Sequence, residues 1–211
     1  MDLYYVCQMV DGVTREPGAY LRNVEDIFGD MASSSLVRAY PKWTCFHIFV
    51  EELISSVIFE DAEKFKNVPG RYWVDYLLRS NGISAQPVNS SDFGRNDGYE
   101  YLEALQQEDL ISQLCETVSK QVFHVLFSNR GTMSAFGHMV SYYVLHTASA
   151  FASDAFNGSG HLNRVSVPLW AKSAVFHRDK GRCVLCQKDL TRLFSQQSQV
   201  HYDHIIPLDL G

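Results

Sequence analysis

Apolar residues recur at spacings of three and four along much of the chain, a pattern typical of helices that bury one face. The stripe is strongest after Pro41, where it comprises Phe46, Phe49, Val50, Leu53, Ile54, Val57 and Ile58. It predicts a helix that ends at the Asn-Val-Pro-Gly sequence of residues 67–70. The same spacing predicts further helices over residues 71–80, over 99–128, and from residue 132 or 134 to 156. The predicted fold class is therefore mainly α.

The first 41 residues give mixed signals. Residues 3–6 suit either a short strand or the start of a helix, and residues 23–29 suit a short helix that ends at glycine. The sequences Asp11-Gly12 and Glu16-Pro17-Gly18 are typical of turns. The strand and helix alternatives for residues 3–6 therefore stay open.

A run of glycines and small polar residues, Asn157-Gly158-Ser159-Gly160-His161, indicates a linker. We expect an α-helical domain over residues 1–156, a linker over 157–167 and a small module over 168–211. Within the module, we expect a short helix from Pro168 to residue 179.

Two features of the small module are candidates for chemistry. After the helix and a Lys180-Gly181 turn, the pair Cys183 and Cys186 is expected in a tight loop. Further on, Asp203-His204 heads the apolar run Ile205-Ile206-Pro207-Leu208 in a strand-like segment. Together with Arg178-Asp179 ahead of the cysteines, these residues resemble the HNH (ββα-metal) endonuclease family. The resemblance covers residues 168–211 and implies that they are the start of such a module.

The resemblance implies roles for four residues. His204 would be the general base that activates water, because imidazole titrates near neutral pH. Asp203 would be a ligand of a catalytic Mg²⁺ or Mn²⁺. Cys183 and Cys186 would be one half of a structural Zn²⁺ site, which needs four ligands. A thioredoxin-like redox pair is the alternative for the cysteines, and the missing βαβ pattern disfavours it.

The chain ends where the family's Asn, last His and second cysteine pair would follow. We therefore expect these 211 residues to be an inactive truncation of a longer nuclease. A naturally shortened, catalytically silent relative is the alternative.

Charge changes sign along the chain. Residues 164–211 hold seven basic and four acidic side chains, a net charge of +3, whereas the whole chain carries −6 and residues 1–163 therefore −9. A weakly basic module on an acidic body is compatible with phosphate contacts. Arg178, Lys180 and Arg182 are the candidate nucleic-acid-binding residues. Ordinary surface variation explains the charge split equally well.

The N-terminus, the length of the apolar runs and the cysteine content indicate the cellular compartment. The N-terminus shows no signal peptide, and no apolar run is long enough for a membrane span. Five cysteines, only two of them close in sequence, favour reduced thiols. The sequence therefore predicts a cytoplasmic protein.

The helical domain carries no motif that names a function. His47 and Glu51 have the spacing of a metal pair, but a surface contact is the favoured interpretation. His138, Tyr142 and His146 share a helix face that could line a nucleotide pocket, although core or interface packing is favoured.

By analogy with other HNH fusions, we expect this domain to regulate or target a nuclease that cuts DNA, with phage defence as a typical setting. RNA remains an alternative substrate. The rival hypothesis is a non-catalytic helical module that forms a homo-oligomer or binds a partner protein and carries a vestigial tail.

Overall fold

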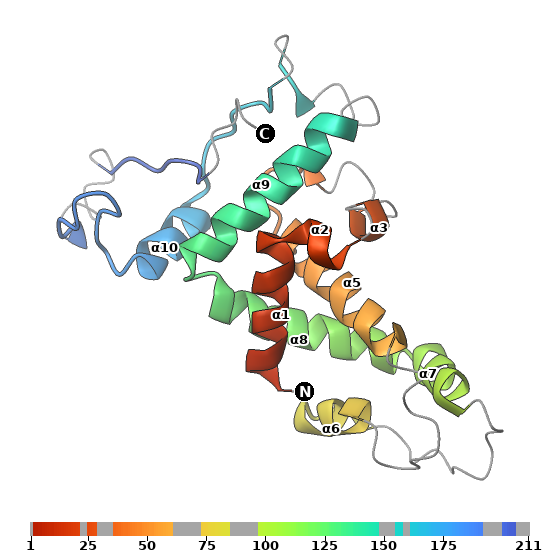
Figure 1. The fold of residues 1–211 in the computed structure, drawn as a ribbon. Helices are drawn as coiled ribbons and strands as arrows, with labels where there is room; N and C mark the ends of the chain where they lie inside the picture. Colours follow the sequence, from red (N-terminus) through yellow and green to blue (C-terminus); the bar gives the residue numbers. More distant parts are fainter. Residues whose placement is uncertain are drawn as a thin grey trace. The chain divides into compact units, whose positions relative to one another are not determined.

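The computed structural model of the chain describes residues 2–21, 25–28, 36–60, 73–84, 97–147, 155–157, 161–191 and 200–205. The prediction of a mainly α-helical fold is confirmed (Figure 1). The helices are α1 (Leu3–Arg15), α2 (Pro17–Tyr20), α3 (Glu25–Phe28), α5 (Cys45–Glu60), α6 (Trp73–Ser80), α7 (Asp97–Gln107), α8 (Leu110–Leu126), α9 (Arg130–Thr147) and α10 (Leu169–Arg178). Within these ranges, no helix combines the length and the apolarity that a bilayer crossing requires.

The chain divides into two compact units. The first contains residues 1–28 and 45–125, and the second contains residues 29–44 and 126–211. Helices α1 to α7 and nearly all of α8 lie in the first unit, whereas α9 and α10 lie in the second. The linker expected over residues 157–167 stays a prediction.

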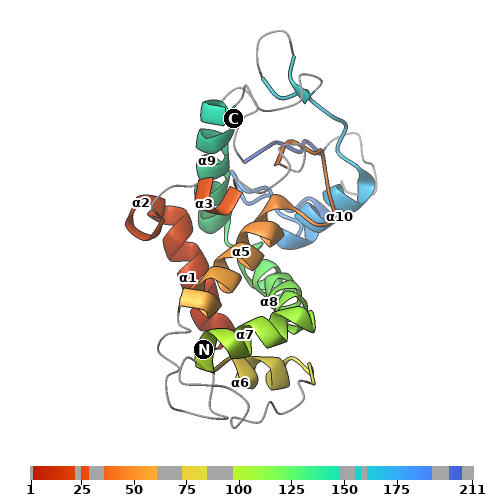
Figure 2. The same cartoon turned by 90° about the vertical axis from the view of Figure 1, so that its right-hand side faces the viewer.

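Helix α5 is the centre of the first unit. It contacts α1 and α3, and its Phe49 ring stacks on Phe28 of α3 with ring centroids 6.0 Å apart. Its Phe46 ring contacts Phe123 of α8 at 6.3 Å, and Figure 2 shows α5 between α1 and α8. The predicted stripe is confirmed, with these members buried: Phe46, Phe49, Val50, Leu53, Ile54 and Ile58. Each such side chain contributes roughly 1.5–3 kcal/mol when it leaves water.

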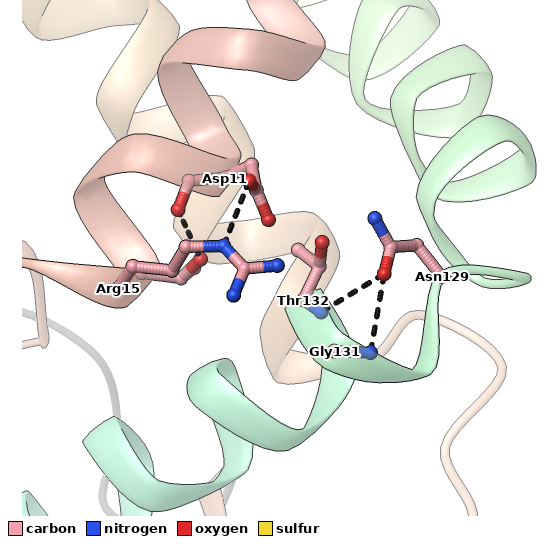
Figure 3. Close-up of polar contacts among 6 residues, drawn as sticks. Asp11, Arg15, Asn129, Gly131 and Thr132 are labelled. Atoms are coloured by element: carbon pink, nitrogen blue, oxygen red, sulfur yellow. Dashed lines mark hydrogen bonds and ion pairs between the residues drawn. The ribbon is translucent and has the colours of Figure 1, made fainter.

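Helix α1 settles the ambiguity at the N-terminus in favour of a helix. It begins at Leu3 because the Asp2 carboxylate accepts a hydrogen bond from the backbone N–H of Tyr5 at 2.8 Å. The turn expected at Asp11-Gly12 is wrong, because Gly12 lies inside the helix. Asp11 instead pairs with Arg15 one turn later at 2.8 Å (Figure 3). The buried residues Val6, Val10 and Val13 outweigh the low helix propensity of one glycine.

The single helix predicted over residues 99–128 is wrong, because the structure has two. Helix α7 ends at Gln107, and α8 begins at Leu110. Between them, Asp109 has a φ of +61°, a left-handed conformation that Asp tolerates better than most residues. The break leaves both Leu105 and Leu110 buried. The apolar spacing continues across the break, so it gave no sign of the interruption.

Helix α9 begins at Arg130, a little before the predicted start. The side-chain oxygen of Asn129 accepts hydrogen bonds from the backbone N–H groups of Gly131 at 3.1 Å and Thr132 at 3.3 Å (Figure 3). Asn129 therefore caps the helix. The predicted end at Phe156 is wrong, because Phe156 pairs with Leu162 in an isolated antiparallel bridge.

The residues that flank the glycine-rich linker pair with each other. The backbone N–H of Asn157 donates to the carbonyl of His161 at 2.8 Å, and that of Asn163 donates to Ala155 at 2.9 Å. The glycines themselves lie outside the described residues. Apart from this pairing, the only other bridge within the described residues joins Arg182 to Asp189.

His47 makes the stability of the first unit depend on pH. The surface contact favoured from its spacing is wrong, because the side chain is only 5% exposed and stacks on Phe123 at 4.4 Å. Burial, aided by the positive charges of His124 and Lys120, lowers the pKa of His47 from 6.5 to about 4. The unfolded chain therefore binds a proton between pH 6.5 and 4 that the folded protein does not. We expect the free energy of unfolding to fall by about 2–3 kcal/mol over this window through His47.

The measurement is urea denaturation at several pH values. His47→Leu keeps apolar volume and removes the titrating group, so its stability should change less between pH 7 and pH 4 than that of the native chain. His138→Gln, at an exposed position, is the control and should keep the native slope. Equal slopes for His47→Leu and the native chain would contradict the prediction.

Candidate functional site

Helix α10 leads into the cysteine pair. Pro168 is its N-cap residue, close to the predicted start. At its end, Lys180 and Gly181 have φ values of +56° and +65°, and the N–H of Gly181 donates to the carbonyl of Phe176 at 2.8 Å. This bond closes the helix in the manner of a Schellman motif. The predicted Lys180-Gly181 turn is confirmed.

A narrow hairpin follows the turn. At its base, the N–H of Leu190 donates to the carbonyl of Gly181 at 2.8 Å, and Arg182 pairs with Asp189 in the antiparallel bridge. A Cβ atom on Gly181 would lie 2.9 Å from both Phe176 Cζ and Thr191 Cγ2. Only glycine therefore fits this position, where the hairpin packs on the end of α10.

The cysteine pair lies at the tip of the hairpin, as the sequence predicts. The N–H of Cys183 donates to the carbonyl of Lys188 at 2.9 Å, and the N–H of Gln187 donates to the carbonyl of Cys183 at 2.8 Å. Gln187 takes a φ of +59° to complete the loop. Cys183 is half-buried and Cys186 is exposed.

Backbone amides favour the thiolate form of Cys183. Its sulfur accepts hydrogen bonds from the N–H groups of Cys186 and then Leu185, and these bonds, with a contact to the Cys186 thiol, lower the pKa of Cys183. Thiolates are the ligands that Zn²⁺ prefers, so the donor type fits the metal that the resemblance implies. The number of ligands is too small for a structural Zn²⁺ site, because no group of three or more potential ligand residues forms among the described residues.

The Asp-His pair lies on an exposed segment. Asp203 and His204 are both exposed, and Asp203 Oδ1 accepts a hydrogen bond from the backbone N–H of His204 at 3.0 Å. The neighbouring Tyr202 ring lies 5.9 Å from the Lys172 ammonium group of α10, which ties this segment to that helix. A carboxylate and an imidazole are suitable donors for a divalent cation. Residues 206–208 of the predicted strand-like run lie outside the described residues.

Arg178 is engaged inside the protein. Its side chain is only 7% exposed, and its guanidinium group donates two hydrogen bonds of 2.9 Å to the Asp179 carboxylate. The group also lies 5.2 Å above the Phe127 ring, and Arg130 pairs with the same carboxylate at 3.5 Å. A phosphate contact by Arg178 would therefore have to replace this pairing. Lys180 and Arg182, the other two candidates, are exposed.

The structure thus brings together some predicted residues and adds others. Cys183 and Cys186 share one hairpin, and Asp203 and His204 share one exposed segment, but within the described residues no hydrogen bond or ion pair joins the two pairs. No sequence pattern pointed to Phe127 or Arg130, because both of these partners of the Arg178–Asp179 pair come from a distant part of the chain.

The second candidate surface lies on α9. His138 is exposed, and Tyr142 is 60% exposed. Of the favoured interpretation, core or interface packing, the core half is therefore wrong for these two residues, and interface packing stays a prediction. The side chain of His146 lies outside the described residues, and a nucleotide pocket on this face stays a prediction.

No protein-family model, no curated protein and no solved structure matches this chain. Function is therefore inferred from the residues of the small module and from their local geometry.

Cys183 should be more reactive than the buried thiols. Burial raises the pKa of Cys45 to about 11 and that of Cys115 to about 12, whereas the amides lower the pKa of Cys183. At pH 7.5, in the presence of a chelator, we expect iodoacetamide to alkylate Cys183 about tenfold faster or more, because the thiolate is the nucleophile. Peptide mass spectrometry measures the three rates, and equal rates at Cys183 and Cys45 would overturn the expectation.

Gly181→Ala should destabilise the second unit. The left-handed backbone costs about 1 kcal/mol for alanine, and the close contacts of the new methyl group bring the expected loss to about 3 kcal/mol. Gly82→Ala is the matched control, since Gly82 has a φ of +72° with open space around it, and it should lose only about 1 kcal/mol. Chemical denaturation measures both, and similar losses would show that the Phe176 and Thr191 contacts are unimportant.

Proposed function

We propose that residues 168–211 begin a ββα-metal (HNH) module and that the protein is a metal-dependent endonuclease of DNA. The proposal is supported by two features that occur together in one short stretch of chain. A helix closed at Gly181 leads into a hydrogen-bonded Cys-x-x-Cys hairpin, and an adjacent carboxylate and imidazole follow on an exposed segment.

Phosphodiester hydrolysis needs a base that works near neutral pH and a means of neutralising phosphate charge. His204 is exposed, so its imidazole can reach a water molecule next to a bound phosphate. Asp203 would hold Mg²⁺ or Mn²⁺ together with phosphate oxygens. The cation supplies charge neutralisation of the phosphate and of the leaving oxygen when it is bound.

The cysteines have a structural role in this proposal. Cys183 and Cys186 would contribute two of the four ligands of a Zn²⁺ ion, and the amides that stabilise the Cys183 thiolate favour metal binding at neutral pH. Lys180 and Arg182 would contact DNA phosphates from the exposed side of the hairpin. Arg178 would join them only by exchanging Asp179 for a phosphate.

The helical first unit would regulate or target cutting, with phage defence as the setting. RNA is the alternative substrate. A second candidate function, partner binding or homo-oligomerisation without catalysis, is favoured by the exposed aromatic side chains of the first unit, Tyr4, Tyr5, Tyr20 and Tyr76. Exposed tyrosines are enriched at protein interfaces.

The test is cleavage of plasmid DNA by the product of the complete reading frame that contains these residues. We expect cutting that depends on Mg²⁺ or Mn²⁺, and we expect His204→Ala to lower its rate about 10²- to 10⁴-fold through loss of the base. His201→Ala, an exposed imidazole on the same segment, is the matched control and should cut at nearly the native rate.

Two outcomes would sink the nuclease proposal. One is the absence of metal-dependent cutting of DNA or RNA by the complete product. The other is a His204→Ala rate equal to that of His201→Ala. Retention of biological activity after deletion of residues 168–211 would favour the non-catalytic alternative.

A further inference from the structure

The tip of the cysteine hairpin exposes apolar side chains. Leu185 is 92% exposed, the largest value among the large hydrophobic residues that the structure describes, and its neighbour Val184 is 39% exposed. A leucine in open water forfeits the hydrophobic free energy that it would gain against an apolar surface. A partner with an apolar surface would gain this free energy by covering the leucine.

The tip is held rigidly. The hydrogen bonds between Cys183 and Lys188 and between Gln187 and Cys183 close the loop, and the amide of Leu185 itself points at the Cys183 sulfur. The base is fixed by Gly181 against α10. A rigid loop loses little conformational entropy when it inserts a side chain into a partner.

Positive charge surrounds the tip. Lys180, Arg182 and Lys188 are exposed, and none of them forms an ion pair within the described residues. Of the two carboxylates nearby, Asp179 is half-buried and Asp189 is exposed, so the three cations outnumber the exposed carboxylate. Asp179 pairs with Arg178, and Asp189 accepts hydrogen bonds from the backbone N–H and hydroxyl of Thr191 at 2.8 and 2.6 Å.

Arg182 and Lys188 flank the leucine from opposite strands of the hairpin. Arg182 pairs with Asp189, and the next rung joins Cys183 to Lys188. The apolar side chain of Leu185 therefore lies at a tip that has one cationic side chain on each strand. Such a tip suits a surface that alternates flat apolar faces with anionic groups, and nucleic acid has this chemistry.

We propose that Leu185 is an apolar wedge that the hairpin presses against exposed base faces of DNA, with Arg182 and Lys188 on the flanking phosphates. The choice of DNA rests on the proposed function. A fully paired duplex covers its base faces by stacking, so the wedge favours DNA with unpaired or kinked bases. The hairpin would thus select the shape of the DNA rather than its sequence.

The test measures binding rather than cutting. The 211-residue chain carrying His204→Ala is titrated by fluorescence anisotropy into a duplex with a three-base bulge and into the same duplex without it. The bulged strand carries 2-aminopurine beside the bulge, which reports any change in base stacking. Leu185→Ser is the test variant, and Leu169→Ser is the matched control, since Leu169 is also an exposed leucine of this unit, at 63%.

We expect Leu185→Ser to weaken binding of the bulged duplex about tenfold, to abolish the 2-aminopurine response and to leave paired-duplex binding nearly unchanged. Leu169→Ser should bind both DNAs like the parent chain. Arg182→Gln and Lys188→Gln should each weaken binding to both DNAs and lower the slope of log K against log salt by about one.

Several results would overturn the wedge. They are equal binding of bulged DNA by Leu185→Ser and the parent, equal losses for Leu185→Ser and Leu169→Ser, and no measurable affinity for either DNA. Leucine-dependent self-association or binding of an acidic protein without DNA affinity would also overturn it and assign the tip to a protein partner. Leu185-dependent DNA binding without cutting by the complete product would support the wedge while the nuclease proposal failed.

Discussion

The candidate site depends on the left-handed turn at Gly181. Helix α10 can end and the chain can fold back only because residue 181 takes a φ of +65° with no Cβ atom between Phe176 and Thr191. The hairpin hydrogen bonds start from this turn, since Leu190 binds the Gly181 carbonyl and Arg182 then pairs with Asp189. The position of the cysteines, the amides directed at the Cys183 sulfur and the exposure of Leu185 all follow from the hairpin.

Ion pairing inside the protein determines which charged side chains stay exposed around this hairpin. The Asp179 carboxylate forms ion pairs with Arg178 and Arg130, and the Arg178 guanidinium group also lies over the Phe127 ring. These contacts tie the end of α10 to the beginning of α9 and pair Arg178 with Asp179 inside the protein. Three cations, Lys180, Arg182 and Lys188, and one carboxylate, Asp189, stay exposed around the hairpin. The exposed side of the hairpin is therefore cationic although the whole chain carries a net charge of −6. A local positive surface on an acidic protein can bind phosphates at short range, where neighbouring charges matter more than the total.

The first unit has a different physical basis. Its stability comes from the apolar stripe of α5 against α1, α3 and α8, and the imidazole of His47 is included in that core. An imidazole stacked on Phe123 tolerates burial only while it is neutral. The unit therefore gains specific aromatic packing, and it loses stability in acid. The sequence showed His47 only as a polar residue at a helical position, and its neighbours Phe123 and His124 come from another helix.

The sequence by itself determined the features that arise from near neighbours. Apolar spacing predicted α5 and the mainly α-helical fold, and Lys180-Gly181 with Cys183 and Cys186 predicted the turn and the tight loop, because backbone preferences act within a few residues. Tertiary structure decided which polar groups are covered and which apolar groups remain exposed. Asp109 breaks a helix that the spacing continued, His47 is buried, Arg178 pairs internally and Leu185 stays exposed. The burial of His47 against Phe123 and the position of Arg178 over Phe127 depend on atoms from distant segments, and such packing is a property of the folded chain that local spacing does not contain.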